Sequence, residues 1–229
     1  MISPYKGQDC LNRVIRVIIA IDGPAAAGKG TLARRLAREF NFAYLDTGSL
    51  YRAVGLSLLR AGVDPADEDA AVAASADLAP ALLSDPALRD EATGGAASVV
   101  AAMPMVRSNL LEFQRNFAQH PPDDKAGAVL DGRDVGTVVC PDAPVKLFVT
   151  ASPEERARRR TDELLAKGQA VDFGEILADV KARDARDSGR KDAPLKPAED
   201  ALLLDTTNLD IDAVFLRAKA LVQKALASQ

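Results

Sequence analysis

One segment limits what this 229-residue chain can fold into more than any other, Gly23-Pro-Ala-Ala-Ala-Gly-Lys-Gly-Thr31. It follows an apolar run, Val14–Ile21, and opens a helix-like run, Thr31–Phe40. A glycine-rich turn with a lysine between a strand and a helix is typical of phosphate-binding loops. Residues without a Cβ let backbone amides converge on phosphate oxygens, and the helix N-terminus adds donors and positive charge. We therefore expect nucleotide phosphates to be bound by Gly23, Pro24, Ala25, Ala26, Ala27, Gly28, Lys29, Gly30 and Thr31.

The lysine of this loop is expected to take part in catalysis, because it is a compact cation for the phosphate at the reacting end. After Lys29 such loops usually carry Ser or Thr, whereas this chain has Gly30 and then the hydroxyl of Thr31. The Gly-Lys-Gly-Thr ending resembles that of nucleoside monophosphate kinases and differs from that of switch GTPases. A mere tight connection in an α/β protein is the alternative, which the flanking strand, helix and lysine disfavour.

Short apolar runs alternate with amphipathic runs over much of the chain, which indicates βαβ units and a parallel sheet. The expected strands are Val14–Ile21, Phe42–Leu45, Ala128–Leu130, Val145–Thr150 and Ala201–Leu204. The expected helices are Thr31–Phe40, Leu50–Leu59, Val106–Ala118, Glu154–Lys167, Phe173–Arg186 and Ile211–Ala227. We predict an α/β fold of the P-loop NTPase type, a central parallel β-sheet flanked by helices.

The stretch Gly62–Gly127 interrupts that alternation with many prolines and glycines and is too long for a loop. We expect an inserted subdomain of short helices and strands there.

Further along the chain, Ser152-Pro-Glu-Glu155 has the pattern of a helix start, with Ser152 as N-cap and Pro153 in the first helical position.

Two residues, one at the end of a predicted strand and one near the start of a predicted helix, point to phosphate chemistry. Asp131 follows an apolar strand, and ligands of open parallel sheets gather beyond the carboxyl ends of the strands. We expect Asp131 and Thr31 to hold Mg²⁺, Asp131 directly or through water. Arg52, one turn into the second helix, is placed to hold a second phosphate. A simple Asp-Gly turn and a solvated arginine are the alternatives.

Arginines and lysines cluster in the two helices after Ser152. The run from Lys181 to Arg190 and the earlier Arg156, Arg158, Arg159 and Arg160 supply many cations. Charge runs on helices are often solvated faces. Phosphoryl transfer, however, needs cations around the migrating group, and a basic hairpin folding over two nucleotides would supply them and exclude water.

Together these motifs resemble bacterial cytidylate kinases from about Val14 to the C-terminus. The more specific blocks are Asp131-Gly-Arg-Asp-Val-Gly-Thr137 and Arg183-Asp-Ala-Arg-Asp187. The resemblance implies a core (residues 14–61, 127–152 and 198–229), a monophosphate-binding insert (62–126) and a lid (153–197). Residues 1–13 are expected to form a polar extension and not a signal peptide.

The resemblance also implies residue roles. Acceptor-phosphate binding and catalysis would involve Arg52, Arg133, Arg183 and Arg190. The cytosine would be read by Ser98, Arg107 and Asp134, the ribose by Asp187, and Thr47 stands where the family more often has serine. Independently, a carboxylate such as Asp134 can accept a hydrogen bond from the cytosine N4 amine, where uracil presents an acceptor.

We therefore expect ATP-dependent, Mg²⁺-assisted phosphorylation of CMP and dCMP. The alternatives are a kinase for AMP, UMP or another metabolite, and a nucleotide-dependent switch. The net charge of −4 gives no indication of a nucleic-acid or membrane partner. Cys10 and Cys140 have no metal-type spacing and suit a reducing cytoplasm, and we expect a monomer. Cys140 is expected in the core and His120 in a surface loop.

Overall fold

The computed structural model describes residues 17–227. The predicted polar extension and the first three residues of the predicted first strand (14–16) lie outside this part. The strands are β1 (Val17–Asp22), β2 (Ala43–Asp46), β3 (Gly127–Gly132), β4 (Val145–Thr150) and β5 (Leu202–Asp205). The α-helices are α1 (Lys29–Phe40), α2 (Thr47–Arg60), α3 (Glu68–Ala76), α4 (Glu91–Val100), α5 (Pro104–Gln119), α6 (Pro153–Ala166), α7 (Phe173–Ser188) and α8 (Ile211–Ala227).

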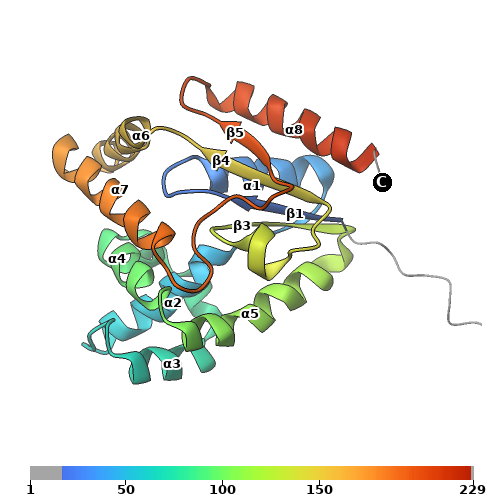
Figure 1. Cartoon of the computed structure of the whole chain (residues 1–229). Helices are drawn as coiled ribbons and strands as arrows, with labels where there is room; N and C mark the ends of the chain where they lie inside the picture. The colour runs from blue at the N-terminus through green and yellow to red at the C-terminus, as the bar shows by residue number, and fades with distance from the viewer. Residues whose placement is uncertain (1–16, 228–229) are drawn as a thin grey trace, which may run out of the picture.

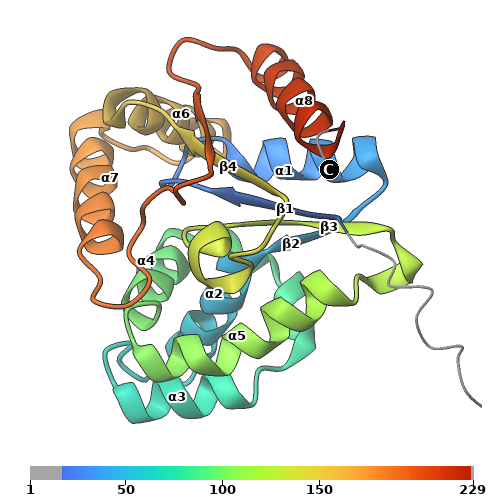
Figure 2. The same ribbon diagram turned by 45° about the vertical axis from the view of Figure 1, so that its right-hand side comes forward.

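The strands form one five-stranded sheet in the order β2-β3-β1-β4-β5, and all pairs are parallel. Helices α1 and α8 cover one face, whereas α2 and α5 cover the other (Figures 1 and 2). Because side chains alternate along a strand, Ile19 and Ile21 of β1 join the core with α1 and α8, and Ala20 joins the core on the opposite face. The predicted α/β fold with a central parallel sheet is confirmed.

Helices are the only regular secondary structure between β2 and β3. Besides α2 to α5 this segment contains the short 3₁₀ helices η1 (Pro80–Ser84), η2 (Pro86–Arg89) and η3 (Pro122–Asp124), and no strand between residues 62 and 126. The expectation of strands in this insert was therefore wrong. Prolines at the first helical position begin η1, η2 and α5, so these residues start helices where we had read them as breaks.

The insert packs closely on α2 through a glycine. A Cβ added to Gly55 of α2 would lie 2.9 Å from the Cβ of Ala96 and 3.0 Å from the Ala97 nitrogen, both on α4. Buried Leu50, Val54 and Val100 fill the surrounding core of this part. The second helix consequently faces the sheet on one side and the insert on the other.

Most predicted boundaries lie within a few residues of the observed ones. The Ser152 hydroxyl accepts a hydrogen bond from the Glu155 nitrogen at 3.2 Å, which confirms the predicted helix start. Cys140 is buried and His120 exposed at the end of α5, as expected. The sequence did not indicate η4, a π-helical turn over Val135–Val139. Among residues 17–227, no helix is long and apolar enough to span a bilayer.

The burial pattern predicts a contrast between two leucines of the sheet. Leu130 in β3 is fully buried, whereas Leu203 in the edge strand β5 is 63% exposed. Leu130→Ala should lower the free energy of unfolding by about 2–5 kcal/mol, because it leaves a cavity in the central sheet. Leu203→Ala should change it by only about 0.5 kcal/mol. Urea denaturation followed by circular dichroism compares them, and equal losses would contradict the burial assignment.

Candidate active site

The carboxyl ends of three neighbouring strands bring acidic residues together. β1 ends at Asp22 and β2 at Asp46, and β3 carries Asp131 directly opposite Asp46 in the strand register. The phosphate-binding loop starts at the end of β1, so it lies at the same edge. This convergence follows from parallel pairing, because every strand then ends on the same side of the sheet.

The loop between β1 and α1 needs glycine at two positions. Gly23 has φ +147°, and a Cβ there would lie 1.9 Å from the Val149 carbonyl oxygen. Gly28, the N-cap of α1, has φ +85° and no side chain to cap the helix amides. Ala26 is also left-handed, with φ +58°. The backbone therefore turns sharply here and leaves the first amides of α1 facing the strand ends.

The loop lysine is buried in this turn. Lys29 is 6% exposed and donates a hydrogen bond from Nζ to the Pro24 carbonyl at 2.7 Å. Burial, and next the charge of Arg133, lower the pKa of Lys29 to about 7. A bound phosphate would supply the negative charge that this buried amine lacks.

Asp131 is a buried carboxylate whose negative charge favours the charged form of Lys29. Burial, and next the charge of Asp46, raise the pKa of Asp131 to about 7. Tyr44 donates a hydrogen bond to Asp131 Oδ1 at 3.1 Å. A Cβ on Gly30 would lie 3.5 Å from Asp131 Oδ2. The irregular glycine after the lysine therefore leaves the space beside this carboxylate open.

These groups fit a magnesium ion held mainly by nucleotide and water. No group of three or more His, Cys, Asp or Glu side chains that could hold a metal occurs in the described part of the chain. Mg²⁺, however, commonly binds through one or two carboxylates together with waters and substrate phosphates. The paired charges of Asp46 and Asp131, which raise the pKa of the latter, would be relieved by such a cation. Thr31, the other predicted ligand, is exposed in the first turn of α1.

A second group of charges joins β3 to α7. Arg133 Nε donates to Asp187 Oδ2 at 2.8 Å, and Arg190 pairs with the other oxygen of the same carboxylate. Asp187 is 1% exposed. Burial alone would raise the pKa of Asp187, but Arg133 and Arg190 outweigh it and hold the pKa below its usual value.

Two arginine nitrogens in this group have no acceptor. The Nε atoms of Arg183 and Arg190 are buried and have no hydrogen-bond partner among the described residues. Burial, and next the charge of Arg133, lower the pKa of Arg183 to about 10. Buried donors without acceptors destabilise a protein. A cluster of like charges with free donors is a site prepared for an anion.

Arg52 lies on the side of the insert. Its guanidinium donates to the Leu88 carbonyl at 2.8 Å. It also packs on α4, where a Cβ on Gly94 would lie 3.1 Å from Arg52 NH1. Burial lowers the pKa of Arg52, and the charges of Arg160 and Arg133 contribute to that shift. Arg52 is therefore in the same positive field as the arginines of α7.

The predicted base-reading residues lie in two places. Arg107 pairs with Asp134 Oδ2, donates to the Ala101 carbonyl at 3.3 Å, and lies over the Tyr51 ring at 5.7 Å. Ser98, buried on α4, accepts a hydrogen bond from Arg186 Nε at 3.2 Å. Burial raises the pKa of Asp134 although Arg107 opposes it.

Thr47, the remaining predicted substrate residue, has a structural partner. Its hydroxyl is buried and donates to the Asp131 carbonyl at 2.9 Å. The structure thus fixes Thr47 beside the strand end, and a contact with substrate stays a prediction.

Sequence reasoning missed the roles of two residues that shape this edge. Arg156 is 2% exposed, binds Asp184 through both terminal nitrogens, and donates to the Ala25 carbonyl in the phosphate-binding loop at 3.3 Å. It is thus no solvated arginine of α6, unlike the exposed Arg158. Asp22 was also missed, although a carboxylate that ends a buried strand directly before the loop was a usable signal.

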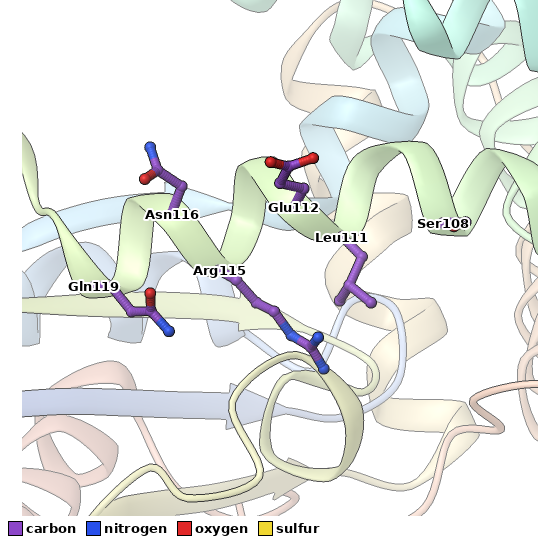
Figure 3. Close-up of a pocket in the computed structure, with 6 residues that line it drawn as sticks. All are labelled: Ser108, Leu111, Glu112, Arg115, Asn116 and Gln119. Carbon is purple, nitrogen blue, oxygen red and sulfur yellow. The ribbon is translucent and has the colours of Figure 1, made fainter.

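A surface hollow of about 370 Å³ lies along α5, away from these strand ends (Figure 3). Ser108, Glu112, Arg115 and Asn116 contribute to its wall. Arg115 points toward η4, where it donates to the Val138 and Val139 carbonyls at 3.0 and 3.1 Å. Arg115 thus attaches α5 to η4, and none of the predicted site residues lines the hollow.

Comparison with known proteins agrees with this geometry. A family model described as cytidylate kinase matches residues 19–224. A cytidylate kinase of Paramagnetospirillum magneticum is 59% identical over 205 residues, covering 90% of this chain and 97% of that protein. Those of Rhodospirillum rubrum and Brucella suis biovar 1 are each 57% identical, over 88% and 92% of this chain and 95% and 94% of their own lengths. Since the similarity spans nearly the whole of both partners, this chain belongs to the cytidylate kinase family.

Proposed function

We propose that the protein transfers the γ-phosphoryl group of ATP to CMP and dCMP, giving ADP and CDP or dCDP. The observation that carries this proposal is the buried arginine cluster with free Nε atoms beside a phosphate-binding loop. A switch or a simple nucleotide-binding module has no need of a second anion site. A phosphotransferase needs one, because its acceptor here is itself a phosphate.

The proposed reaction is a direct in-line transfer. The loop amides and Lys29 would bind the phosphates of ATP, while Arg52, Arg133, Arg183 and Arg190 would hold the acceptor phosphate. No general base is required, because the attacking oxygen already belongs to an anion. Catalysis would consist of positioning and of neutralising the charge that spreads over the migrating phosphoryl group.

We propose Mg²⁺ as the metal of the reaction. Asp131, directly or through water, and Thr31 would hold it together with nucleotide oxygens. When bound, Mg²⁺ neutralises charge on the donor phosphates. Tyr44 would keep the Asp131 carboxylate oriented through its hydrogen bond to Oδ1.

Base choice would depend on Asp134. Within residues 17–227, Arg107 donates to Oδ2 of Asp134 and not to its Oδ1. The Oδ1 atom would therefore accept a hydrogen bond from the cytosine N4 amine. Uracil has a carbonyl in that position, and two acceptors would face each other in a buried site. Arg107 and Ser98 would contact the remaining polar atoms of the base, and Asp187 the ribose.

The proposal includes the predicted division of the chain. Residues 62–126 would bind the monophosphate, and the α6–α7 hairpin within 153–197 would act as the lid. The contacts of Arg160 with Glu91 and of Arg186 with Ser98 support a lid that reaches the insert. We further propose a cytoplasmic monomer that acts on small nucleotides and not on nucleic acid or membranes.

The direct test is a coupled assay of ADP release with CMP, dCMP, UMP and AMP as acceptors. We expect CMP and dCMP to react far faster than UMP, which presents a carbonyl to Asp134 where cytosine presents an amine. We also expect them to react faster than AMP, whose amine is carried by a larger purine ring. Equal rates with UMP would contradict the base assignment. Binding of ATP without turnover on any monophosphate would contradict the proposed activity.

Replacing Arg52 should affect the acceptor selectively. Arg52→Ala is expected to raise KM for CMP about 10- to 100-fold, as one charged hydrogen bond to phosphate is lost, with KM for ATP nearly unchanged. Arg60→Ala is the matched control on the same helix, since Arg60 is half exposed and pairs with Asp85. Initial-rate kinetics with both substrates varied makes the comparison. Equal effects on CMP and ATP would show that Arg52 is misplaced.

The lowered pKa of Lys29 predicts proton uptake on nucleotide binding. Above pH 7 this buried amine is largely neutral, because its pKa is about 7. Phosphate favours the charged form and raises that pKa, so binding of ADP without Mg²⁺ at pH 8 should take up a proton. Titration calorimetry in two buffers of different ionisation enthalpy measures the uptake.

Two variants separate the groups that titrate there. Uptake should disappear in Lys29→Met and persist in Asp131→Asn, although the pKa of Asp131 is also near 7. Uptake that is lost in Asp131→Asn and kept in Lys29→Met would assign the proton to the carboxylate instead.

A further inference from the structure

A carboxylate that the proposed mechanism does not use lies between the two halves of the site. Asp22 ends β1, directly precedes Gly23 of the phosphate-binding loop, and is 4% exposed. Its Oδ1 accepts a hydrogen bond from the Val135 nitrogen at 2.8 Å, and its Oδ2 accepts one from the Gly136 nitrogen at 2.7 Å. Both donors belong to η4, which is 113 or more residues away in sequence.

These two amides open η4, so they have no acceptor within the turn itself. The first N–H groups of a helical turn need an outside partner, and an anion is the favourable one. Burial raises the pKa of Asp22 to about 6, while the two amide hydrogen bonds act against that shift. At neutral pH the carboxylate is therefore mostly ionised and satisfies both donors.

The turn that Asp22 holds carries the proposed acceptor residues. Arg133 and Asp134 directly precede η4, and the Asp134 carbonyl accepts hydrogen bonds from the Val138 and Val139 nitrogens at 2.9 and 3.2 Å. The Asp134 backbone is thus part of the same hydrogen-bonded turn. A displacement of η4 would therefore disturb the ion pairs that Asp134 forms with Arg107 and Arg133 forms with Asp187.

The contact between Asp22 and η4 has no spare space. A Cβ on Gly136 would lie 3.3 Å from Asp22 Oδ2 and 3.2 Å from Lys146 Cδ. Lys146 cannot easily move aside, because it is buried and its Nζ donates to both oxygens of Asp200 at 2.9 and 2.7 Å. The glycine therefore allows the turn to approach the carboxylate closely.

We infer that Asp22 is a positioning residue for the acceptor nucleotide: it fixes the turn bearing Arg133 and Asp134 to the end of the phosphate-binding loop's strand. The inference rests on the proposed function. Asp22 directly precedes the loop that would bind ATP, yet it would position residues that bind the acceptor, CMP.

Asp22→Asn is the sharpest variant, because it keeps the shape and replaces one acceptor oxygen with an NH₂ that faces an amide donor. We expect the dissociation constant for CMP to rise about 10- to 100-fold through misplacement of its contacts, with that for ADP within about 3-fold. Asp210→Asn is the matched control, since Asp210 accepts a hydrogen bond from the Ala213 nitrogen at 2.7 Å just before α8, outside the insert and the lid. Titration calorimetry with each nucleotide gives the constants.

Gly136→Ala tests the same contact without changing a charge, and serves if Asp22→Asn does not fold. It should weaken CMP binding several-fold and leave ADP binding unchanged, because a Cβ there would press on the Asp22 carboxylate. CMP binding as in the wild type, or equal weakening of CMP and ADP in both variants, would overturn the inference alone. A wild-type protein that binds ADP but not CMP would overturn the proposed function and this inference with it.

Discussion

The structure depends on the burial of opposite charges at one edge of a parallel sheet. Asp22 and Asp131 stand at the ends of strands, and Lys29 opens the helix that follows the first of them. Each is nearly removed from water, so burial shifts their pKa values toward the neutral forms. Backbone amides, neighbouring charges and, for Lys29, an anionic ligand favour their charged forms. The rest of the site is arranged around that balance.

The arginines between residues 153 and 190 form two groups with different roles. Their clustering in the sequence does not reveal this division. Arg156 is buried against the phosphate-binding loop and Asp184, and Arg159 donates to Thr206. These arginines attach the α6–α7 hairpin to the core. Arg183 and Arg190, in contrast, keep buried donors without acceptors. Two unsatisfied arginine donors in one charged cluster destabilise the unliganded protein, and such a cost is expected at a binding site.

Local sequence patterns correctly predicted the elements that a short run of neighbouring residues specifies. The apolar strands, the Ser152 cap and the phosphate-binding loop are each specified by residues within one turn or strand, and all are present. The insert was less predictable, because its prolines begin helices and because Gly55 contacts Ala96, which lies 41 residues later in α4. Neither property is visible in a window of neighbouring residues. The same reason hid η4, whose first amides are satisfied by a residue of the first strand.

The sequence by itself determined the chemistry available: a loop for phosphate, carboxylates after strands, and an excess of arginine in two helices. Those features depend on residue types and short spacings, both of which can be read directly from the sequence. Only the tertiary structure decided which of these charges are buried, which pair with each other and which are left for a ligand. Asp22, Arg156 and Arg183 acquire their roles from neighbours far along the chain. The physical reason is that burial and pairing, not residue type, set the energy of a charge.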